Sequence, residues 1–307
     1  MEPPFVPFDA AMEPMGAPAP LDGCVFMTGG PAAYLPGLAC VLRRLEAVGS
    51  RHPVVLAAAQ EDREAMLPLV RNHSGARLMV MRHFPHSYGG RWGKTHVLDK
   101  LNVLGAPFRR VVWIDADVLI RRNVDELCAL PANASFAAAL NIGFRSQTCY
   151  TRTRARSKEY KCQTCAAAGE AATAARPACR YELNTAVMAV APLRSVGDFN
   201  AHVVRPARQG TLPSRDGSDQ GAINSLVHDS RAFGGEPPLV LPSSYNALAR
   251  VASLRREQFE SWRPALVHLS RETKPWQLLQ YGNGTRARYG MAKPGPLQKE
   301  WHAVCGL

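Results

Sequence analysis

The sequence predicts an α/β protein whose central sheet is Rossmann-like, mostly parallel and flanked by helices. Two observations indicate this class. Short apolar runs alternate with helix-length segments through the first half of the chain, and 307 residues are enough for one large domain. Such alternation is typical of βαβ units, and strands that are apolar along their whole length suit the middle of a covered parallel sheet.

Four strands and three intervening segments make up the predicted alternation. The strands are rich in Val, Ile, Leu and Met and span residues 23–28, 53–59, 76–82 and 109–115. Between them, apolar residues recur at helical spacing in 36–48, 60–72 and 94–104. Ligands of open α/β sheets bind beyond the carboxyl ends of the strands, so the functional site is expected where strand 109–115 ends.

The pattern changes in the middle of the chain. Residues 145–181 are basic, rich in Ala and contain four cysteines, so they are interpreted as an insertion. Regular structure then returns with an apolar strand in 181–193 and a helix that begins near 217–227. The sequence therefore predicts a single domain, residues 22–277, with a cysteine-bearing insertion.

Both ends of the chain are expected to be tails. Residues 1–21 are rich in Pro and Ala, and the first twenty lack the Lys or Arg with which a secretory signal begins. Residues 278–307 show little periodicity and predict a C-terminal tail lying on the surface. No run approaches the roughly 18 apolar residues of a membrane span. We therefore expect a cytoplasmic protein without a transmembrane segment, with the Golgi as the alternative compartment.

The chain is basic. It has 37 Lys and Arg against 25 Asp and Glu, a net charge of +12, which favours anionic partners such as nucleotides, phosphates or acidic glycans. The aromatic content of 7% and the lack of a recognisable nucleic-acid-binding motif argue against nucleic acid as a partner. The oligomeric state is left open, with a homodimer among the alternatives.

Two aspartates, Asp115 and Asp117, follow the apolar run of residues 109–115. Residues i and i+2 of a strand point to the same side, so both carboxylates face one point if the strand continues through residue 117. A divalent cation between them would offset their repulsion, and hard oxygen ligands favour Mg²⁺ or Mn²⁺. A turn with an Asx-type cap explains an isolated Asp-x-Asp equally well.

Three further polar clusters lie later in the chain. They contain Asn184 in a buried strand, Asp219 and Gln220 at a helix start, and His268 followed by Lys274. Each has an ordinary explanation when taken alone. Asn184 could be a satisfied core amide, Asp219 a helix cap, His268 a packed core residue and Lys274 a solvated surface charge.

In this order and spacing the clusters resemble the glycogenin-like family of retaining glycosyltransferases, over about residues 23–277. The motifs that carry the resemblance are Asp115-Ala116-Asp117, Asn184-Thr185-Ala186, Asp219-Gln220-Gly221, and His268 with Lys274-Pro275-Trp276. The resemblance implies the nucleotide-sugar-binding GT-A fold and transfer of a hexose to form an α-glycosidic bond. Glycogenin glucosylates its own tyrosine, but the stretch 247–262 contains none, so we expect a separate carbohydrate or other hydroxyl acceptor.

The resemblance also implies roles for individual residues. Asp115, Asp117 and His268 would hold Mn²⁺ or Mg²⁺. The nucleotide-sugar, expected to be a UDP-hexose, would be bound by Thr28, Tyr34, Lys94, Ala116 and Lys274. Asp219, Gln220 and Asn184 would surround the reacting carbon. A cation and a lysine neutralise the charge that builds on a departing diphosphate, which needs no protonating acid. Since Gln220 is a poor nucleophile, same-face attack is favoured over a covalent intermediate.

The sequence departs from the family pattern at a few positions, namely Arg271 and Ala186, where the family has Gly, and Pro31-Ala32-Ala33 before the nucleotide-contacting Tyr34. These changes spare the expected metal ligands but affect the donor side. The alternative is therefore a catalytically weak homologue that binds nucleotide-sugar or glycan. A nucleotidyltransferase is disfavoured because residues 28–34 contain glycines but no basic residue.

The cysteines of the insertion are Cys149, Cys162, Cys165 and Cys179. They are compatible with a structural Zn²⁺, with two disulfides or with free thiols. Zinc ribbons usually have two close cysteine pairs, and here only Cys162 and Cys165 are close. The other four cysteines, Cys24, Cys40, Cys128 and Cys305, are scattered along the chain.

Overall fold

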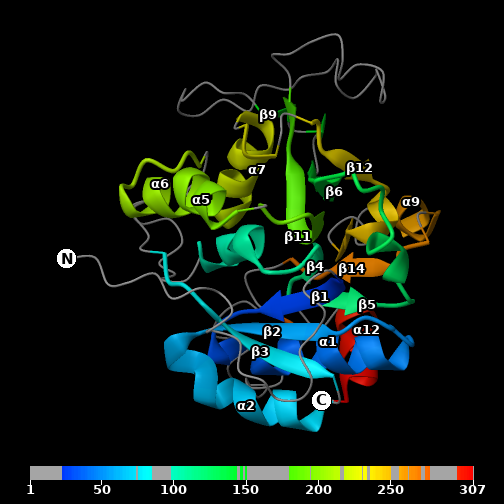
Figure 1. The fold of residues 1–307 in the computed structure, drawn as a ribbon. Coiled ribbons are helices and arrows are strands. Elements are labelled where there is room, and N and C mark those ends of the chain that lie inside the picture. Colours follow the sequence, from blue (N-terminus) through cyan, green and yellow to red (C-terminus); the bar gives the residue numbers. More distant parts are fainter. Residues whose placement is uncertain are drawn as a thin grey trace, which may run out of the picture.

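The central element of the computed structural model is a seven-stranded sheet with strand order β12-β6-β11-β4-β1-β2-β3 (Figure 1). The structure describes residues 23–73, 75–84, 98–143, 146–147, 149–150, 180–193, 195–214, 218–229, 231–233, 236–249, 256–261, 263–270, 274–276 and 296–306. The sheet is mixed and mostly parallel, with helices on both faces, which confirms the predicted fold class.

The first half of the described chain forms the parallel part of the sheet. Its strands are β1 (Cys24–Gly29), β2 (Val54–Ala59), β3 (Ala76–Met81) and β4 (Arg110–Ile114), all within a residue or two of the predicted bounds. The crossovers contain α1 (Leu35–Ala47), α2 (Arg63–Asn72) and, before β4, the 3-10 helix η4 (Asp99–Gly105). Local periodicity was sufficient to predict this half of the sheet.

The second half adds β6 (Phe136–Leu140), β11 (Leu183–Val190) and β12 (Leu239–Leu241). β11 lies between β4 and β6 and is antiparallel to both, with Val187 opposite Ile114. Because of this reversal, the first residues of β11 lie beside the carboxyl end of β4. The residues around the start of β11 therefore lie at the carboxyl edge of the parallel strands, where the site is expected.

A small second sheet brings a distant segment to the same edge. It consists of β13 (Ala247–Leu248), β14 (Leu266–His268) and β5 (Val118–Ile120), in that order. β14 pairs antiparallel with β5, and His268 lies opposite Val118. This register places His268 beside the residues that precede β5.

Neighbouring strand residues point to opposite faces of the large sheet, and each face has its own helical cover. On one face Val55 packs in a cluster with Ile223 of α7 (Asp219–Asp229), and on the other Leu56 packs with Leu38 of α1. The remaining elements are η2 (Ala32–Tyr34), η3 (Gln60–Asp62), η5 (Asp125–Leu127), β7 (Ile142–Gly143), β8 (Ser146–Gln147), β9 (Cys149–Tyr150), β10 (Arg180–Tyr181), α5 (Val196–Phe199), the π-helical η7 (Asn200–Val204), α6 (Arg205–Arg208), η8 (Arg231–Phe233), η9 (Ser243–Tyr245) and α9 (Arg256–Ser261).

The expectation of a surface tail after residue 277 is wrong for residues Pro296–Cys305. They form the helix α12, which lies against α1 (Figure 1). Trp301 of this helix is fully buried in the cluster that also contains Leu38 and Trp276. A ten-residue helix with three buried positions gives too short a periodic signal to separate it from a basic tail.

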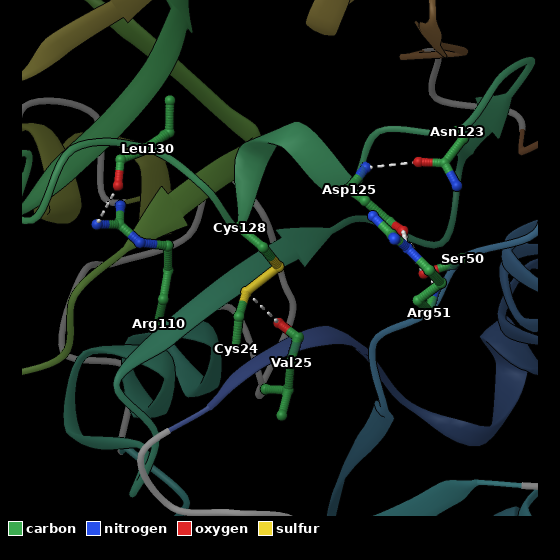
Figure 2. Close-up of a disulfide and its surroundings, with 9 residues drawn as sticks. All are labelled: Cys24, Val25, Ser50, Arg51, Arg110, Asn123, Asp125, Cys128 and Leu130. Carbon is green, nitrogen blue, oxygen red and sulfur yellow. Dashed lines mark hydrogen bonds and ion pairs between the residues drawn. A yellow bond between two sulfur atoms is a disulfide. The ribbon is translucent and has the colours of Figure 1, made fainter.

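Two disulfides join the four cysteines that are scattered in the sequence. Cys24 pairs with Cys128 at a Cα–Cα distance of 5.7 Å, and Cys40 pairs with Cys305 at 5.0 Å. The first bond ties the start of β1 to Cys128, directly after η5 (Figure 2). Both bonds close long loops, so both are expected to stabilise the fold.

Three of the four proposed zinc ligands are not covered by the described residues. Cys162, Cys165 and Cys179 lie outside them, and Cys149 is described only as part of strand β9. The zinc interpretation therefore stays a prediction. Among the described residues no helix is both long and apolar enough to cross a membrane.

Candidate functional site

The two aspartates lie in a turn between β4 and β5. The strand ends at Ile114 and β5 begins at Val118, so the condition of a continuous strand through residue 117 is not met and the aspartates lie in the turn that was the alternative. The amide of Asp115 donates to the carbonyl of Ala186 at 2.8 Å, and the amide of Val118 donates to the carbonyl of Asp115 at 3.0 Å, closing the turn. The turn nevertheless brings both carboxylates together, because one oxygen of each carboxylate and one ring nitrogen of His268 lie within 4.8 Å of one another.

Asp117 interacts with two residues of the motif at residues 268–276, His268 and Lys274. His268 Nε2 lies 3.6 Å from its Oδ1, and Lys274 Nζ lies 2.6 Å from its Oδ2. Burial by itself would raise the pKa of Asp117, but His268 and Lys274 outweigh it and hold that pKa well below its usual range. The carboxylate is therefore ionised at neutral pH, as a metal ligand must be.

Lys100 is a site residue that sequence reasoning missed. Its Nζ lies 2.8 Å from Asp115 Oδ1 and 2.8 Å from Asp219 Oδ2, so one ammonium bridges two of the predicted residues. Burial would lower the pKa of Lys100, but the two carboxylates outweigh it and the pKa is raised. The only sequence feature that could have indicated Lys100 was its position within the expected helical segment 94–104. The resemblance indicated Lys94 as the site lysine of this segment instead.

Asp115 has a second partner in β4, the strand that precedes the turn. The indole Nε1 of Trp113 donates to Asp115 Oδ1 at 2.6 Å, and Lys100 Nζ lies 5.6 Å from the centre of the Trp113 ring. One oxygen of Asp115 is thus held by an indole N–H and an ammonium. This arrangement fixes the direction in which the carboxylate faces the turn.

Gln220 is held at both ends of its carboxamide. Its Nε2 donates to Glu182 Oε1 at 2.6 Å, and its Oε1 accepts the amide of Thr185 at 3.3 Å. Lys100 Nζ also lies 3.4 Å from the carbonyl of Thr185, so the start of β11 contacts the same group of side chains. Glu182 was not predicted, because it follows the insertion and no motif marks it.

Asn184 makes a network of its own. Its Oδ1 accepts the amide of Ala186 at 3.0 Å and Nδ2 of Asn246 at 2.9 Å, and its Nδ2 donates to Asn141 Oδ1 at 3.3 Å. This is the geometry of the satisfied core amide, which was the ordinary explanation of this residue. A role for Asn184 beside the reacting carbon stays a prediction.

The expected nucleotide-contacting residues cluster near Trp276. The Tyr34 ring lies edge-on to Trp276 with centroids 5.3 Å apart, and Lys274 Nζ lies 5.7 Å from the Tyr34 centroid. Ala116 is buried in the turn, and its carbonyl lies 2.5 Å from where a Cβ on Gly37 would be.

The remaining candidates are placed less fully. Thr28 is buried near the carboxyl end of β1, and no hydrogen-bond partner satisfies its Oγ1 in the part of the chain that is described. Lys94 and the motif departure Arg271 lie outside the described residues.

Two carboxylates and one imidazole could hold a divalent cation. Asp115, Asp117 and His268 supply two hard oxygen donors and one nitrogen donor around a common point. Such a set leaves coordination positions for other oxygen ligands and suits Mn²⁺ or Mg²⁺ better than thiolate-preferring metals. The residues present therefore fit the predicted metal.

No protein-family model and no curated protein matches this sequence. Solved structures do match. The galactosyltransferase LgtC, solved with donor and acceptor sugar analogs, superposes with a TM-score of 0.57 at 14% identity over 92% of this chain and 95% of LgtC. The bifunctional glycosyltransferase WbbM gives a TM-score of 0.58 at 14% identity, over 97% of this chain and 53% of WbbM. GlyE of Streptococcus pneumoniae gives 0.56 at 13% identity, over 93% of this chain and 61% of GlyE.

These matches define the class of fold. The chain has the GT-A fold, the α/β architecture of glycosyltransferases, with the acidic pair at the carboxyl edge of the sheet. Its structural match is to GT-A glycosyltransferases such as LgtC and GlyE, as the sequence motifs predicted. At identities this low, the structural similarity establishes the fold, and the reaction has to be inferred from the residues of the site.

Proposed function

We propose that the protein is a metal-dependent retaining glycosyltransferase. It would move a hexose from a nucleotide-sugar, expected to be UDP-linked, to the hydroxyl of a separate acceptor and form an α-glycosidic bond. The observation that supports this best is the meeting of Asp115, Asp117 and His268 at one point, within a GT-A fold. LgtC, which shares the fold, was solved with donor and acceptor sugar analogs.

The chemistry requires positive charge where the diphosphate leaves. Asp115, Asp117 and His268 would hold a divalent cation, which when bound stabilises the negative charge of the departing diphosphate. Lys274 lies on the same side of the site. Burial would lower the pKa of Lys274, but Asp117 outweighs it and raises that pKa, so the lysine is a permanent cation beside the expected phosphate position.

The sugar side of the site carries Asp219 and Gln220. Lys100 holds the carboxylate of Asp219, and Glu182 and Thr185 hold the carboxamide of Gln220. In same-face attack, the bond from the anomeric carbon to the diphosphate oxygen breaks while the acceptor oxygen bonds to that carbon. The acceptor's proton passes to the departing phosphate oxygen. A fixed amide dipole beside the carbon stabilises its transient positive charge without forming a covalent bond.

The test is release of nucleoside diphosphate from a panel of UDP- and GDP-linked sugars in Mn²⁺, with and without simple sugar acceptors. We expect one donor to be consumed, and Asp117→Asn to reduce turnover at least about 100-fold because a metal ligand is lost. Asp125→Asn is the matched control, since Asp125 is also a buried carboxylate but lies near the start of β1, at the opposite edge of the sheet. A wild-type protein that binds donor but releases no nucleotide would favour the alternative, a binding homologue.

The disulfides bear on the compartment. Cys24–Cys128 and Cys40–Cys305 are of a kind that persists in oxidising compartments and is rare in the cytosol. They favour the Golgi alternative over the cytoplasmic expectation. Thiol titration of the protein from its native source, with and without reductant, tests this.

A further inference from the structure

Helix α12 is attached to the domain by three separate interactions. Its last residue, Cys305, is bonded to Cys40 of α1. Glu300 receives two hydrogen bonds from the guanidinium of Arg121, at 2.8 and 2.6 Å. Between these points Trp301 is fully buried. A bidentate ion pair and a disulfide on either side of a buried indole leave this helix little freedom to shift.

The buried indole of Trp301 lies against a second indole. The ring centroids of Trp301 and Trp276 are 6.0 Å apart, and the ring of Trp276 in turn lies 5.3 Å from that of Tyr34. Trp276 also packs closely against Gly37 of α1, where an added Cβ would lie 2.4 Å from Trp276 Cζ3. Trp276 is therefore enclosed by α1, Tyr34 and α12, and its position depends on all three.

Trp276 anchors the short segment that contains the site residue Lys274. It lies two residues after Lys274, whose Nζ is 2.6 Å from Asp117 Oδ2 and 5.7 Å from the centre of the Tyr34 ring. A movement of the Trp276 ring would displace the backbone that places Lys274, and it would remove the edge contact that orients Tyr34. Both residues are the ones expected to meet the nucleotide diphosphate.

We propose that α12 is part of the donor-binding site, with Trp301 as a positioning residue for Lys274 and Tyr34 and the Cys40–Cys305 disulfide as the bond that holds the helix in place. The inference rests on the proposed function, because it assigns α12 to the nucleotide side of the proposed reaction. Misplacing a binding group by about 1 Å can cost up to 100-fold in an enzyme, so loss of this support should be measurable as weaker donor binding. Asp219 and Gln220, which are expected beside the reacting carbon, are held by Lys100 and Glu182 instead, so the KM for the acceptor should change less than the KM for the donor.

The experiment measures the Kd of UDP, and of GDP in parallel, with Mn²⁺ by calorimetry, together with KM for donor and acceptor. Trp301→Ala should raise the nucleotide Kd and the donor KM about tenfold with little change in acceptor KM. Trp301→Phe, which keeps an aromatic ring against Trp276, should restore most of the affinity. The double variant Cys40→Ser/Cys305→Ser should also raise the nucleotide Kd. It keeps Trp301 in the core, so it provides a second test in case Trp301→Ala does not fold.

The matched control is Cys24→Ser/Cys128→Ser. It removes the other disulfide, which lies at the start of β1, whereas the nucleotide site is expected beyond the other end of the strands. This control should lower the unfolding temperature and leave the nucleotide Kd unchanged. Unchanged Kd in both the Trp301 and the Cys40/Cys305 variants would overturn the inference and leave the proposed function standing. A wild-type protein that binds neither UDP nor GDP would instead overturn the proposed function.

Discussion

Glu182 accepts a 2.6 Å hydrogen bond from Nε2 of Gln220, which places a carboxylate directly behind the amide that is expected to face the reacting carbon. Thr185 donates to the other end of the same carboxamide, so the positions of its oxygen and nitrogen are determined by their partners. A side chain with several rotatable bonds is thereby held in one orientation before substrate binds.

Replacing Glu182 by Ala should free the carboxamide of Gln220. A hydrogen bond to a charged acceptor contributes about 1.5–3 kcal/mol, so we expect turnover to fall about 10- to 100-fold while the donor KM changes little. The turnover of Gln220→Ala should fall by at least the same factor. Steady-state kinetics of both variants checks this, with Glu64→Ala, at an exposed glutamate, as the control. Full turnover of Gln220→Ala would remove the glutamine from the mechanism.

Lys100→Met should damage both stability and activity. The substitution keeps the approximate volume but removes the ammonium that neutralises Asp115 and Asp219. Breaking such a mostly buried pair costs about 3 kcal/mol, and the two carboxylates would then repel each other near the site. Urea unfolding and turnover measure the two effects. Lys100→Arg should retain more of both, and if Lys100→Met unfolds like the wild type, the bridge is not structural.

The stabilisation by Asp125 should depend on pH. Ser50 and the amide of Arg51 donate to its carboxylate at 2.9 and 3.1 Å (Figure 2). Burial alone would raise the pKa of Asp125, but these hydrogen bonds outweigh it and lower the pKa. A lowered pKa means that the stabilisation is fully present above the unfolded-state pKa of about 3.9 and is lost as the pH falls through the folded-state value.

Asp125→Asn should therefore lower the free energy of unfolding by about 1–2 kcal/mol at pH 7. The difference from the wild type should shrink as the pH falls below about 4. Urea unfolding of the two proteins between pH 7 and pH 3 provides the measurement. A difference that stays constant, or grows on acidification, would contradict the assignment.

Gly37→Ala tests the packing around Trp276 from the side of α1. The new Cβ would lie 2.4 Å from Trp276 Cζ3 and 2.5 Å from the carbonyl of Ala116, so both contacts must be relieved by movement of α1 or of these neighbours. Overpacking of this kind costs about 1–3 kcal/mol, and we expect weaker nucleotide binding as well. Gly197→Ala in α5 is the control, because its Cβ would meet only Ser195 Oγ at 3.5 Å. Equal unfolding temperatures for the two variants would contradict the prediction.

The sequence by itself determined the parallel half of the sheet and the edge of the sheet at which the candidate site lies. The apolar runs that form β1, β2, β3 and β4 are local patterns, and such patterns predict strands without knowledge of the tertiary fold. The same holds for the two aspartates at the end of β4. Their convergence with His268 was anticipated from the resemblance, although the carboxylates meet through a turn and not along a strand.

Only the tertiary structure decided which distant residues meet. Lys100 bridges Asp115 and Asp219, and Cys40 reaches Cys305, across separations that no local periodicity encodes. Trp301 lies in a segment whose sequence resembles a tail, and only its packing against Leu38 of α1 and Trp276 shows that the indole is buried. The physical reason is that these contacts form only when burial of apolar surface, summed over the whole domain, outweighs the entropy of closing long loops.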